Sequence, residues 1–394
     1  MARRRRPKKR INKKVALIGS GAFLLLAGLI VVALLHFGGD PSQYIADGDV
    51  ALAEQHYELA ENNYRRALAV KAKETQIELL FKLADVYTRL DQWPKVRASW
   101  EGVLLRDPDN IKAGLAILET LYQRADSQAR IGWKAPDLWK EIGVRSTDLL
   151  AVAGRAGVLE RGKAEWEMEG LAQAVEGQTI AHYLYFLRGR ALFEQAEMGA
   201  MANTNEGLEA AREDLDRVIA LAPQDVDAYW YLAKVAVVAG ELESAQGEVL
   251  ARQRALKQAD EVLARAITAA TDNPKAYLNR LQVRLEAFQR TKREPSATEL
   301  RALEEAYEGL VQRFGDDADV YTDVSKFYWM CCFYLGSAQG EANMDKAVRA
   351  AEQAVDLGEV VVPGIGCETG DVHFEVEENI ANQRHQQEGE RHAQ

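Results

Sequence analysis

The sequence has 394 residues, of which 47% are hydrophobic and 28% charged, which is the composition of a chain that folds. This balance excludes disorder along the whole length, because enough apolar surface is present to form a core. The formal net charge of −11 disfavours nucleic acid as a partner of the folded part, since an acidic surface repels the phosphate backbone.

The N-terminal residues 1–14 are strongly basic, and the apolar residues 15–37 follow them. The apolar run contains no formally charged residue apart from the titratable His36, and about 20 apolar residues are enough to cross a bilayer. A cleaved secretory signal is the alternative, but its apolar region is usually only about 7–15 residues long and is followed by a small-x-small site. Residues 36–40 offer no such site, so we predict an uncleaved transmembrane signal anchor at 15–37.

The charges around this span predict its orientation. Lysine and arginine concentrate on the cytoplasmic side of a membrane span, and the basic segment 1–14 has no counterpart after Phe37. We therefore expect 1–14 in the cytoplasm and the rest of the chain outside it, in the periplasm if the source is bacterial. Binding of the basic segment to anionic lipid or nucleic acid is an alternative role, and it is compatible with the first.

Residues 41–358 form the body of the protein, and apolar residues recur through it at helical spacing, which predicts an all-α fold. Within 41–110 one pattern of residues occurs twice. The first copy consists of Tyr57, Ala60, Tyr64, Ala67 and Leu68, and the second of Trp93, Val96, Trp100, Val103 and Leu104. The pattern resembles the tetratricopeptide repeat, which has about 34 residues. The resemblance implies an α-solenoid of antiparallel helical hairpins that meet through small residues such as Gly48 and Ala84.

The rest of the body keeps the pattern unevenly. Residues 111–181 begin with another helix but lose the register, which predicts a divergent helical spacer. Residues 182–358 are predicted to contain further repeats with inserts, in one of which a lengthened second helix would use both Ala245 and Ala259 as small contacts. Residues 359–394 are polar and rich in glutamine and glutamate, which predicts an irregular, disordered tail.

The resemblance also implies a binding surface, because in the family a concave groove is lined by the first helix of each repeat, including its fifth and ninth positions. Fifth positions would be Ile45, Phe81, Phe186, Trp230, Leu278 and Thr322, and ninth positions Asp49, Asp85, Arg190 and Lys234. We predict a groove for a protein or peptide partner, acidic toward the N-terminus and basic farther along. The residues predicted to bind the partner are Phe81, Asp85, Phe186, Arg190, Trp230 and Lys234. The alternative is that the three aromatic side chains pack against neighbouring helices.

Sequence signatures of catalysis, metal binding or cofactor binding are missing. None of the six histidines is paired at i, i+4, and there is neither a C-x-x-C motif nor a G-x-x-x-x-G-K-[ST] phosphate loop. Cys331 and Cys332 lie in an apolar aromatic run, where cysteine usually behaves as a small buried hydrophobe. We therefore expect a chain that is not an enzyme and that uses no metal and no cofactor.

The combined prediction is a membrane-anchored scaffold on the extracytoplasmic side, which binds other proteins in envelope assembly, secretion or quality control. A structural protein that forms homo-oligomers through its repeats is the first alternative. An accessory region of a longer enzyme is the second, because residues 111–181 or sequence beyond Gln394 could carry chemistry. Repeat folds serve many processes, so the fold by itself does not name a pathway.

Overall fold

The regular structure is helical throughout the part of the chain that can be described. The computed structural model describes residues 40–70, 73–130, 132–162, 178–245, 247, 250–291, 295–334 and 336–358. Within these ranges every named element is an α-helix, and one isolated β-bridge joins Gly162 to Thr179. The prediction of an all-α body is confirmed for these residues.

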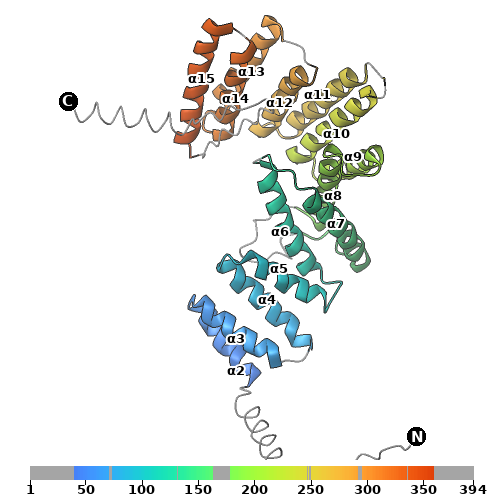
Figure 1. Ribbon diagram of the computed structural model, residues 1–394, viewed down its shortest axis with the longest axis vertical. Coiled ribbons are helices and arrows are strands. Elements are labelled where there is room, and N and C mark those ends of the chain that lie inside the picture. Colours follow the sequence, from blue (N-terminus) through green and yellow to red (C-terminus); the bar gives the residue numbers. More distant parts are fainter. Residues whose placement is uncertain are drawn as a thin grey trace, which may run out of the picture. The chain divides into compact units, whose positions relative to one another are not determined.

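The helices follow one another through short connections and are labelled in Figure 1. They are α2 (Pro41–Ala53), α3 (Tyr57–Val70), α4 (Lys73–Arg89), α5 (Trp93–Leu104), α6 (Ile111–Arg130), α7 (Pro136–Ala156), α8 (Ile180–Glu197), α9 (Thr204–Leu221), α10 (Val226–Ala245), α11 (Ala251–Ala269), α12 (Pro274–Thr291), α13 (Ala297–Arg313), α14 (Ala318–Tyr334) and α15 (Gly336–Asp356). The described residues divide into two compact units, with the boundary between Thr120 and Leu121 inside α6.

The first unit contains the hairpins α2/α3 and α4/α5. Asp40 caps α2 by accepting a hydrogen bond from the backbone of Ser42, and Pro41 starts the helix at a position where its missing N–H costs nothing. Gly48 lets α2 approach α3 closely, because a Cβ added there would lie only 2.5 Å from Cε1 of Tyr64. Tyr64 itself is fully buried, so this close approach is part of the core of the unit.

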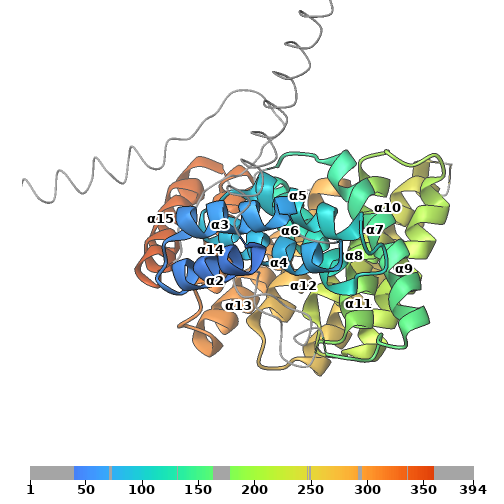
Figure 2. The ribbon, with the colours of Figure 1, turned by 90° about the horizontal axis from the view of Figure 1, so that it is seen from below.

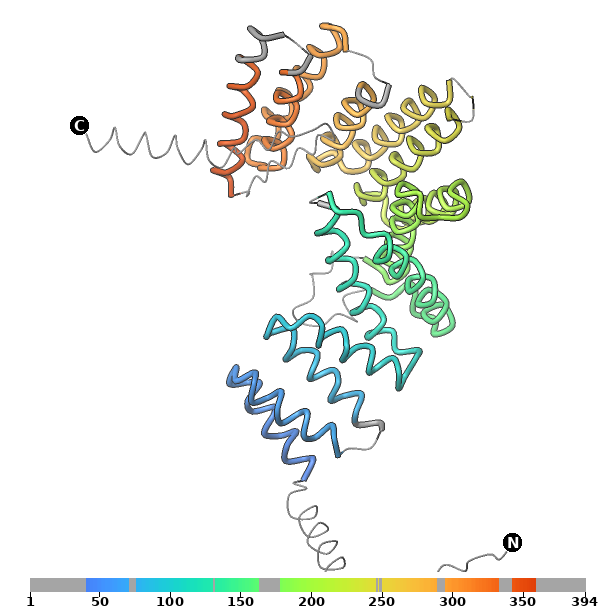
Figure 3. The backbone as a smooth tube through the Cα atoms, in the orientation of Figure 1, coloured from blue at the N-terminus to red at the C-terminus, as the bar shows by residue number. Residues whose placement is uncertain are grey.

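The second unit repeats the same construction with longer helices. Consecutive helices α8 and α9, α10 and α11, and α14 and α15 pack side by side, as the tube in Figure 3 and the two ribbon views show. Gly189 of α8 faces the backbone carbonyl of Ala211, and Gly240 of α10 faces Ala255. A Cβ at Gly240 would collide with the Cβ of Ala255, so the small residue is what allows the two helices to touch.

One position of the first helix is small in almost every hairpin. It lies three residues after the predicted fifth position, and its occupants are Gly48, Ala84, Gly189, Ala233, Leu281 and Ser325. Leu281 of α12 is the only large side chain in this set. It is buried in the apolar core that α12 shares with α13, α14 and α15, and α12 and α13 pack against each other only loosely. A large residue at the contact position therefore coincides with an open hairpin.

Local sequence signals explain where several of these helices begin. Thr179 caps α8 by accepting a hydrogen bond from the backbone of His182, and Ser296 forms a capping box with Glu299 at the start of α13. The predicted extent of one later hairpin was wrong. Ala245 ends the first helix α10 instead of belonging to a lengthened second helix, because α10 continues past Gly240 and α11 begins only at Ala251.

Three of the predicted segments, the basic segment 1–14, the signal anchor 15–37 and the tail 359–394, lie outside the described residues. Among the helices that are described, none has the length and apolar character needed to span a bilayer. The predicted spacer 111–181 includes α6 and α7.

Candidate functional site

Phe81 and Asp85, the first two residues of the predicted groove, lie on α4 in the first unit. The half-buried ring of Phe81 meets Trp100 edge to face at a centroid distance of 5.1 Å, and Nζ of Lys112 lies 5.6 Å from its centroid. The carboxylate of Asp85 accepts a hydrogen bond from Nε of Arg89 at 3.2 Å. Both side chains therefore already have partners within their own unit.

The predicted acidic end of the groove is largely neutralised by internal contacts. Asp49 accepts hydrogen bonds from the Tyr64 hydroxyl at 2.7 Å and from Lys82 at 2.5 Å. Burial by itself would raise the pKa of Asp49, but the hydrogen bonds from Lys82 and Tyr64 outweigh it and lower the pKa. The same arrangement of carboxylate, tyrosine and lysine recurs twice. Its other members are Glu61, Tyr87 and Lys95, and Glu304, Tyr328 and Lys346.

Arg190 of α8 is the most fully enclosed charged residue of the predicted groove, at 5% exposure. Its guanidinium donates to the hydroxyl of Tyr122 at 2.5 Å and to the carboxylate of Asp126 at 2.6 Å. The guanidinium carbon also lies 5.1 Å from the ring centroid of Tyr122, 4.8 Å from that of Trp139 and 4.7 Å from that of Tyr231. We call Tyr122, Asp126, Trp139 and Tyr231 the Arg190 cage.

The Arg190 cage supplies what a buried cation needs. A charge taken out of water is costly unless it is paired and hydrogen-bonded, and three aromatic faces add cation–π attraction. Glu194, one turn further along α8, lies 3.5 Å from Nε of Arg190. Burial raises the pKa of the Glu194 carboxyl, and the charge of Arg190 opposes this rise. Because the cage draws on α6, α7, α8 and α10, it joins four helices and leaves Arg190 no surface for a partner.

Phe186 lies beside the same cage. Its ring meets Tyr122 at 6.5 Å and Tyr231 at 5.9 Å, both edge to face, and the residue is 8% exposed. The aromatic residues of the groove were expected either to bind a partner or to pack against neighbouring helices, and Phe186 packs against neighbouring helices. The second unit therefore fills this stretch of the predicted groove with its own side chains.

Trp230 and Lys234 of α10 are both partly exposed. Nζ of Lys234 lies 5.4 Å from the centroid of Trp230 and 5.6 Å from that of Phe193. Near the start of the same helix, Asp227 pairs with Lys275 of α12 at 2.8 Å, with side-chain exposures of 42% and 51%. We call Asp227, Trp230, Lys234 and Lys275 the α10 patch. It offers a ligand an aromatic face and one cation, Lys234, beside the ion pair of Asp227 and Lys275.

Comparison with known proteins adds little to this picture. No protein-family model and no curated protein matches the sequence. A tetratricopeptide repeat protein from Parabacteroides merdae is 13% identical over 81% of this chain and 94% of its own, with a TM-score of 0.45. A tetratricopeptide repeat protein from Thermus thermophilus is 17% identical over 57% and 95%, with a TM-score of 0.30. Human IFIT1, in a complex with m7Gppp-AAAA, is 14% identical over 87% and 86%, with a TM-score of 0.26. Similarities this weak establish neither a family nor a function.

The sequence interpretation missed the residues that enclose Arg190. Tyr122 and Asp126 precede Arg190 by 68 and 64 residues, so no local pattern connects them to it. Tyr231 follows Trp230 directly, yet Tyr231 contacts Arg190 whereas Trp230 contacts Lys234. The position of a residue in the repeat does not tell which of two neighbouring residues faces Arg190, because that depends on how the helix is rotated about its axis.

The described residues contain no group of three or more metal-ligating side chains. His182 and Asp225 form a close pair at 2.8 Å, but the His182 side chain is 7% exposed. Asp225 also caps α10 by accepting a hydrogen bond from the backbone of Ala228. The pair therefore links α8 to the start of α10 and is not open to a substrate.

Proposed function

We propose that this chain is a scaffold that binds a segment of a partner protein on the α10 patch and acts by binding, without catalysis. The observation that supports this proposal most directly is the division among the predicted groove residues. Phe186 and Arg190 are buried among their own neighbours, whereas Trp230 and Lys234 remain partly exposed on α10. Tryptophan is among the residues that most often dominate the binding energy of protein interfaces.

The chemistry of the α10 patch favours an extended or helical peptide segment. Trp230 offers a large apolar surface, and the adjacent Lys234 can pair with a carboxylate of the partner. Asp227 and Lys275 neutralise each other at 2.8 Å, so we expect them at the polar rim of the interface with the partner and not among the residues that supply most of the binding energy. We therefore expect the partner to place an apolar side chain on Trp230 and an acidic group near Lys234.

Capture of the partner tests the proposal. A photoreactive phenylalanine at Trp230 in the full chain should crosslink one discrete partner in intact cells, and Trp230→Ala should reduce recovery of that partner about tenfold or more. Trp133→Ala is the matched control, because Trp133 is 69% exposed on a loop outside the patch. An equal loss in both variants, or no loss in either, would count against the α10 patch.

We further propose that residues 15–37 anchor the chain in a membrane with 1–14 in the cytoplasm. The support is the length of the apolar run and the basic residues that precede it. The full chain should stay with membranes at alkaline pH, and deletion of residues 1–37 should release it. Protease added outside intact spheroplasts should digest the body. Protection of the body from that protease would reverse the proposed orientation.

Self-association is the second candidate, and one observation favours it. Val348, Val355 and Leu357 of the C-terminal hairpin are 37–38% exposed, although they are apolar. Repeats usually cover such a face with a neighbouring repeat. Light scattering of the full chain distinguishes the two candidates, because a mass of one chain favours the scaffold and a multiple that persists on dilution favours self-association.

A further inference from the structure

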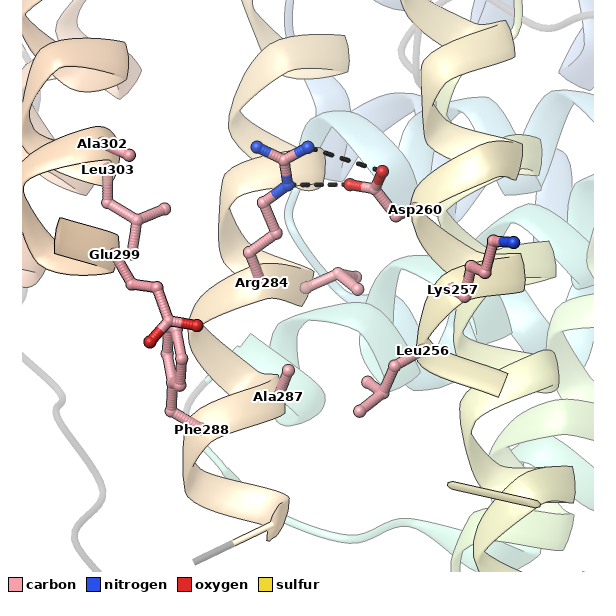
Figure 4. Close-up of a pocket in the computed structure, with 10 residues that line it drawn as sticks. Leu256, Lys257, Asp260, Arg284, Ala287, Phe288, Glu299, Ala302 and Leu303 are labelled. Atoms are coloured by element: carbon pink, nitrogen blue, oxygen red, sulfur yellow. Dashed lines mark hydrogen bonds and ion pairs between the residues drawn. The ribbon is translucent and has the colours of Figure 1, made fainter. Parts of the chain in front are cut away.

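The hairpin α12/α13 contains an open pocket that the predicted groove does not include. Its volume is about 370 Å³, within the range of about 300–1,000 Å³ that ligand pockets occupy. The apolar residues that line it come from α11, α12 and α13. They are Leu256, Val283, Ala287, Phe288, Ala302 and Leu303. Figure 4 shows α11 on one side, α13 on the other and α12 between them.

Leu281 distinguishes this hairpin from the others. The corresponding residue is glycine, alanine or serine in the other hairpins, where the two helices come close together. The side chain of Leu281 is buried in the core that α12 shares with α13, so the large residue at this position coincides with the loose packing of the two helices. An opening of this kind costs apolar burial, and packed interiors normally close such gaps.

The charged side chains that line the pocket are unevenly placed, with Lys257, Asp260 and Arg284 at its α11/α12 end and Glu299 at its α13 end. Asp260 of α11 is the shared acceptor of two guanidinium groups, those of Arg280 at 2.8 and 2.9 Å and of Arg284 at 2.8 and 3.4 Å. One carboxylate cannot neutralise two cations. Lys257 stands on the rim with 81% side-chain exposure and pairs with Glu261 at 3.8 Å. The excess at this end is therefore one positive charge, that of Arg280 and Arg284 over Asp260.

The acidic residue at the other side of the pocket is already engaged. Glu299 of α13 accepts hydrogen bonds from the backbone N–H and the hydroxyl of Ser296, which form the capping box of this helix. Both donors are neutral, so the carboxylate keeps its negative charge. The pocket is therefore positive at its α11/α12 end and negative at its α13 end. The local positive charge near Arg284 lies on a chain whose formal net charge is −11.

We propose that this pocket is a second docking site, which takes a large apolar side chain from an acidic amphipathic segment of a partner protein. The apolar side chain enters between α12 and α13, and a neighbouring carboxylate meets Arg284 and Lys257. The inference rests on the proposed role as a protein-binding scaffold but concerns side chains other than those of the α10 patch. Charge selects the partner here, while the apolar contact supplies most of the affinity.

A designed peptide pair tests the pocket directly. The probe is a fluorescent amphipathic helical peptide of roughly 14 residues with leucines at i, i+3, i+4 and i+7 and glutamates on its flanks. Its counterpart has lysines in place of the glutamates. Fluorescence anisotropy with the full chain should show binding of the acidic peptide and about tenfold weaker binding of the basic one. Equal affinity for both peptides would overturn the proposal.

Matched variants locate the binding. Ala287→Phe should fill the pocket and Lys257→Glu should reverse its rim charge, and each should weaken binding of the acidic peptide about tenfold. Arg254→Glu is the control, because Arg254 is also exposed on α11 but does not line the pocket. Thermal unfolding confirms that the variants remain folded. Unchanged binding in Ala287→Phe and Lys257→Glu, or an equal loss in the control, would overturn the proposal.

The two proposals fail separately. A photoreactive phenylalanine at Phe288 of the full chain should crosslink, in intact cells, a segment whose apolar residues are flanked by acidic ones. A crosslink to a basic segment, or to the chain's own residues 359–394, would overturn the pocket proposal and leave the α10 patch untouched. If Trp230 captures no partner while the acidic peptide still binds at Phe288, only the α10 proposal fails.

Discussion

The hairpins around α8 and α12 begin from the same sequence pattern and end in opposite states. In α8 the contact position is Gly189, the helices close, and the predicted groove is filled by the Arg190 cage. In α12 the contact position is Leu281, the hairpin stays open, and a pocket of about 370 Å³ forms. The comparison teaches that a repeat position predicts the location of a side chain, whereas the size of its neighbours decides whether it is available for binding.

Removing the cation from the Arg190 cage should have the largest effect on the stability of the closed hairpin. Arg190→Ala should lower the free energy of unfolding by about 3–5 kcal/mol, because it leaves Asp126, Glu194 and the Tyr122 hydroxyl without their cation in a buried setting. Urea denaturation of the full chain measures this. Millimolar methylguanidinium should restore part of the lost stability, since the emptied cage still presents three aromatic faces and a carboxylate.

Arg217→Ala is the control for the cage, because Arg217 also lies over a tyrosine ring but is 51% exposed. It should cost less than about 1 kcal/mol. If Arg190→Ala cost no more than Arg217→Ala, the cage would contribute little to stability. The closed state of this hairpin would then need another explanation.

The role of the large residue at the contact position of α12 is tested by shortening it. Leu281→Ala should cost about 2–3 kcal/mol, near the lower end of the range for buried leucines, because α13 can move toward α12 and fill part of the lost volume. The acidic peptide should also bind more weakly to this variant. Leu310→Ala, in the same core, is the control and should cost more without affecting the peptide. An equal cost for both variants with unchanged peptide binding would contradict the role of Leu281.

Two glycine substitutions separate helix contact from helix propensity. Gly240→Ala should destabilise the protein by about 1–3 kcal/mol, because the new methyl group collides with Ala255. Gly309→Ala should stabilise it by up to about 1 kcal/mol, since Gly309 is exposed within α13 and an added Cβ would meet nothing within 4 Å. Thermal midpoints measure both effects. Shifts of the same sign would mean that propensity, not contact, decides these positions.

The sequence predicted the architecture well where the pattern was local. The aromatic residues that open the two copies of the motif are the first residues of their helices, Tyr57 in α3 and Trp93 in α5, and Leu104 ends α5. A spacing of three or four residues reports which side of a helix is apolar, so it specifies helices reliably. It does not specify where α10 ends, because Gly240 could have closed the helix and instead serves as a contact with α11.

The candidate site was less predictable, for a physical reason. Phe186 and Trp230 occupy the same repeat position, yet Phe186 is enclosed by Tyr122 and Tyr231 while Trp230 is partly exposed. The enclosing rings come from other helices, so exposure depends on tertiary contacts that no single-helix pattern contains. The sequence does contain one indication of the pocket, because Leu281 is the single large residue at a contact position that is small in the other first helices.

Acid titration provides the smallest test of the open hairpin. Burial opposes ionisation of Asp260, but hydrogen bonds from Arg280 and Arg284 outweigh it and lower its pKa to about 2. A carboxyl whose pKa falls on folding stabilises the protein above the pKa of the unfolded chain, about 3.9, and this contribution disappears as pH falls through about 2. Because the side chain is 28% exposed, we expect roughly 1–2 kcal/mol.

Asp260→Asn isolates this contribution. The variant should be less stable than the wild type at pH 7, and the gap should narrow between about pH 4 and pH 2, measured by urea denaturation at each pH. Convergence at the acidic end is the internal control, because there the wild-type carboxyl is also neutral. At acidic pH the charges of Arg280 and Arg284 are uncompensated in both proteins. At pH 7 they are uncompensated only in the variant, so the acidic peptide should bind the variant more tightly than the wild type at that pH. A constant gap across this range would mean that Asp260 contributes by packing and that the positive end of the pocket is not set by its ionisation.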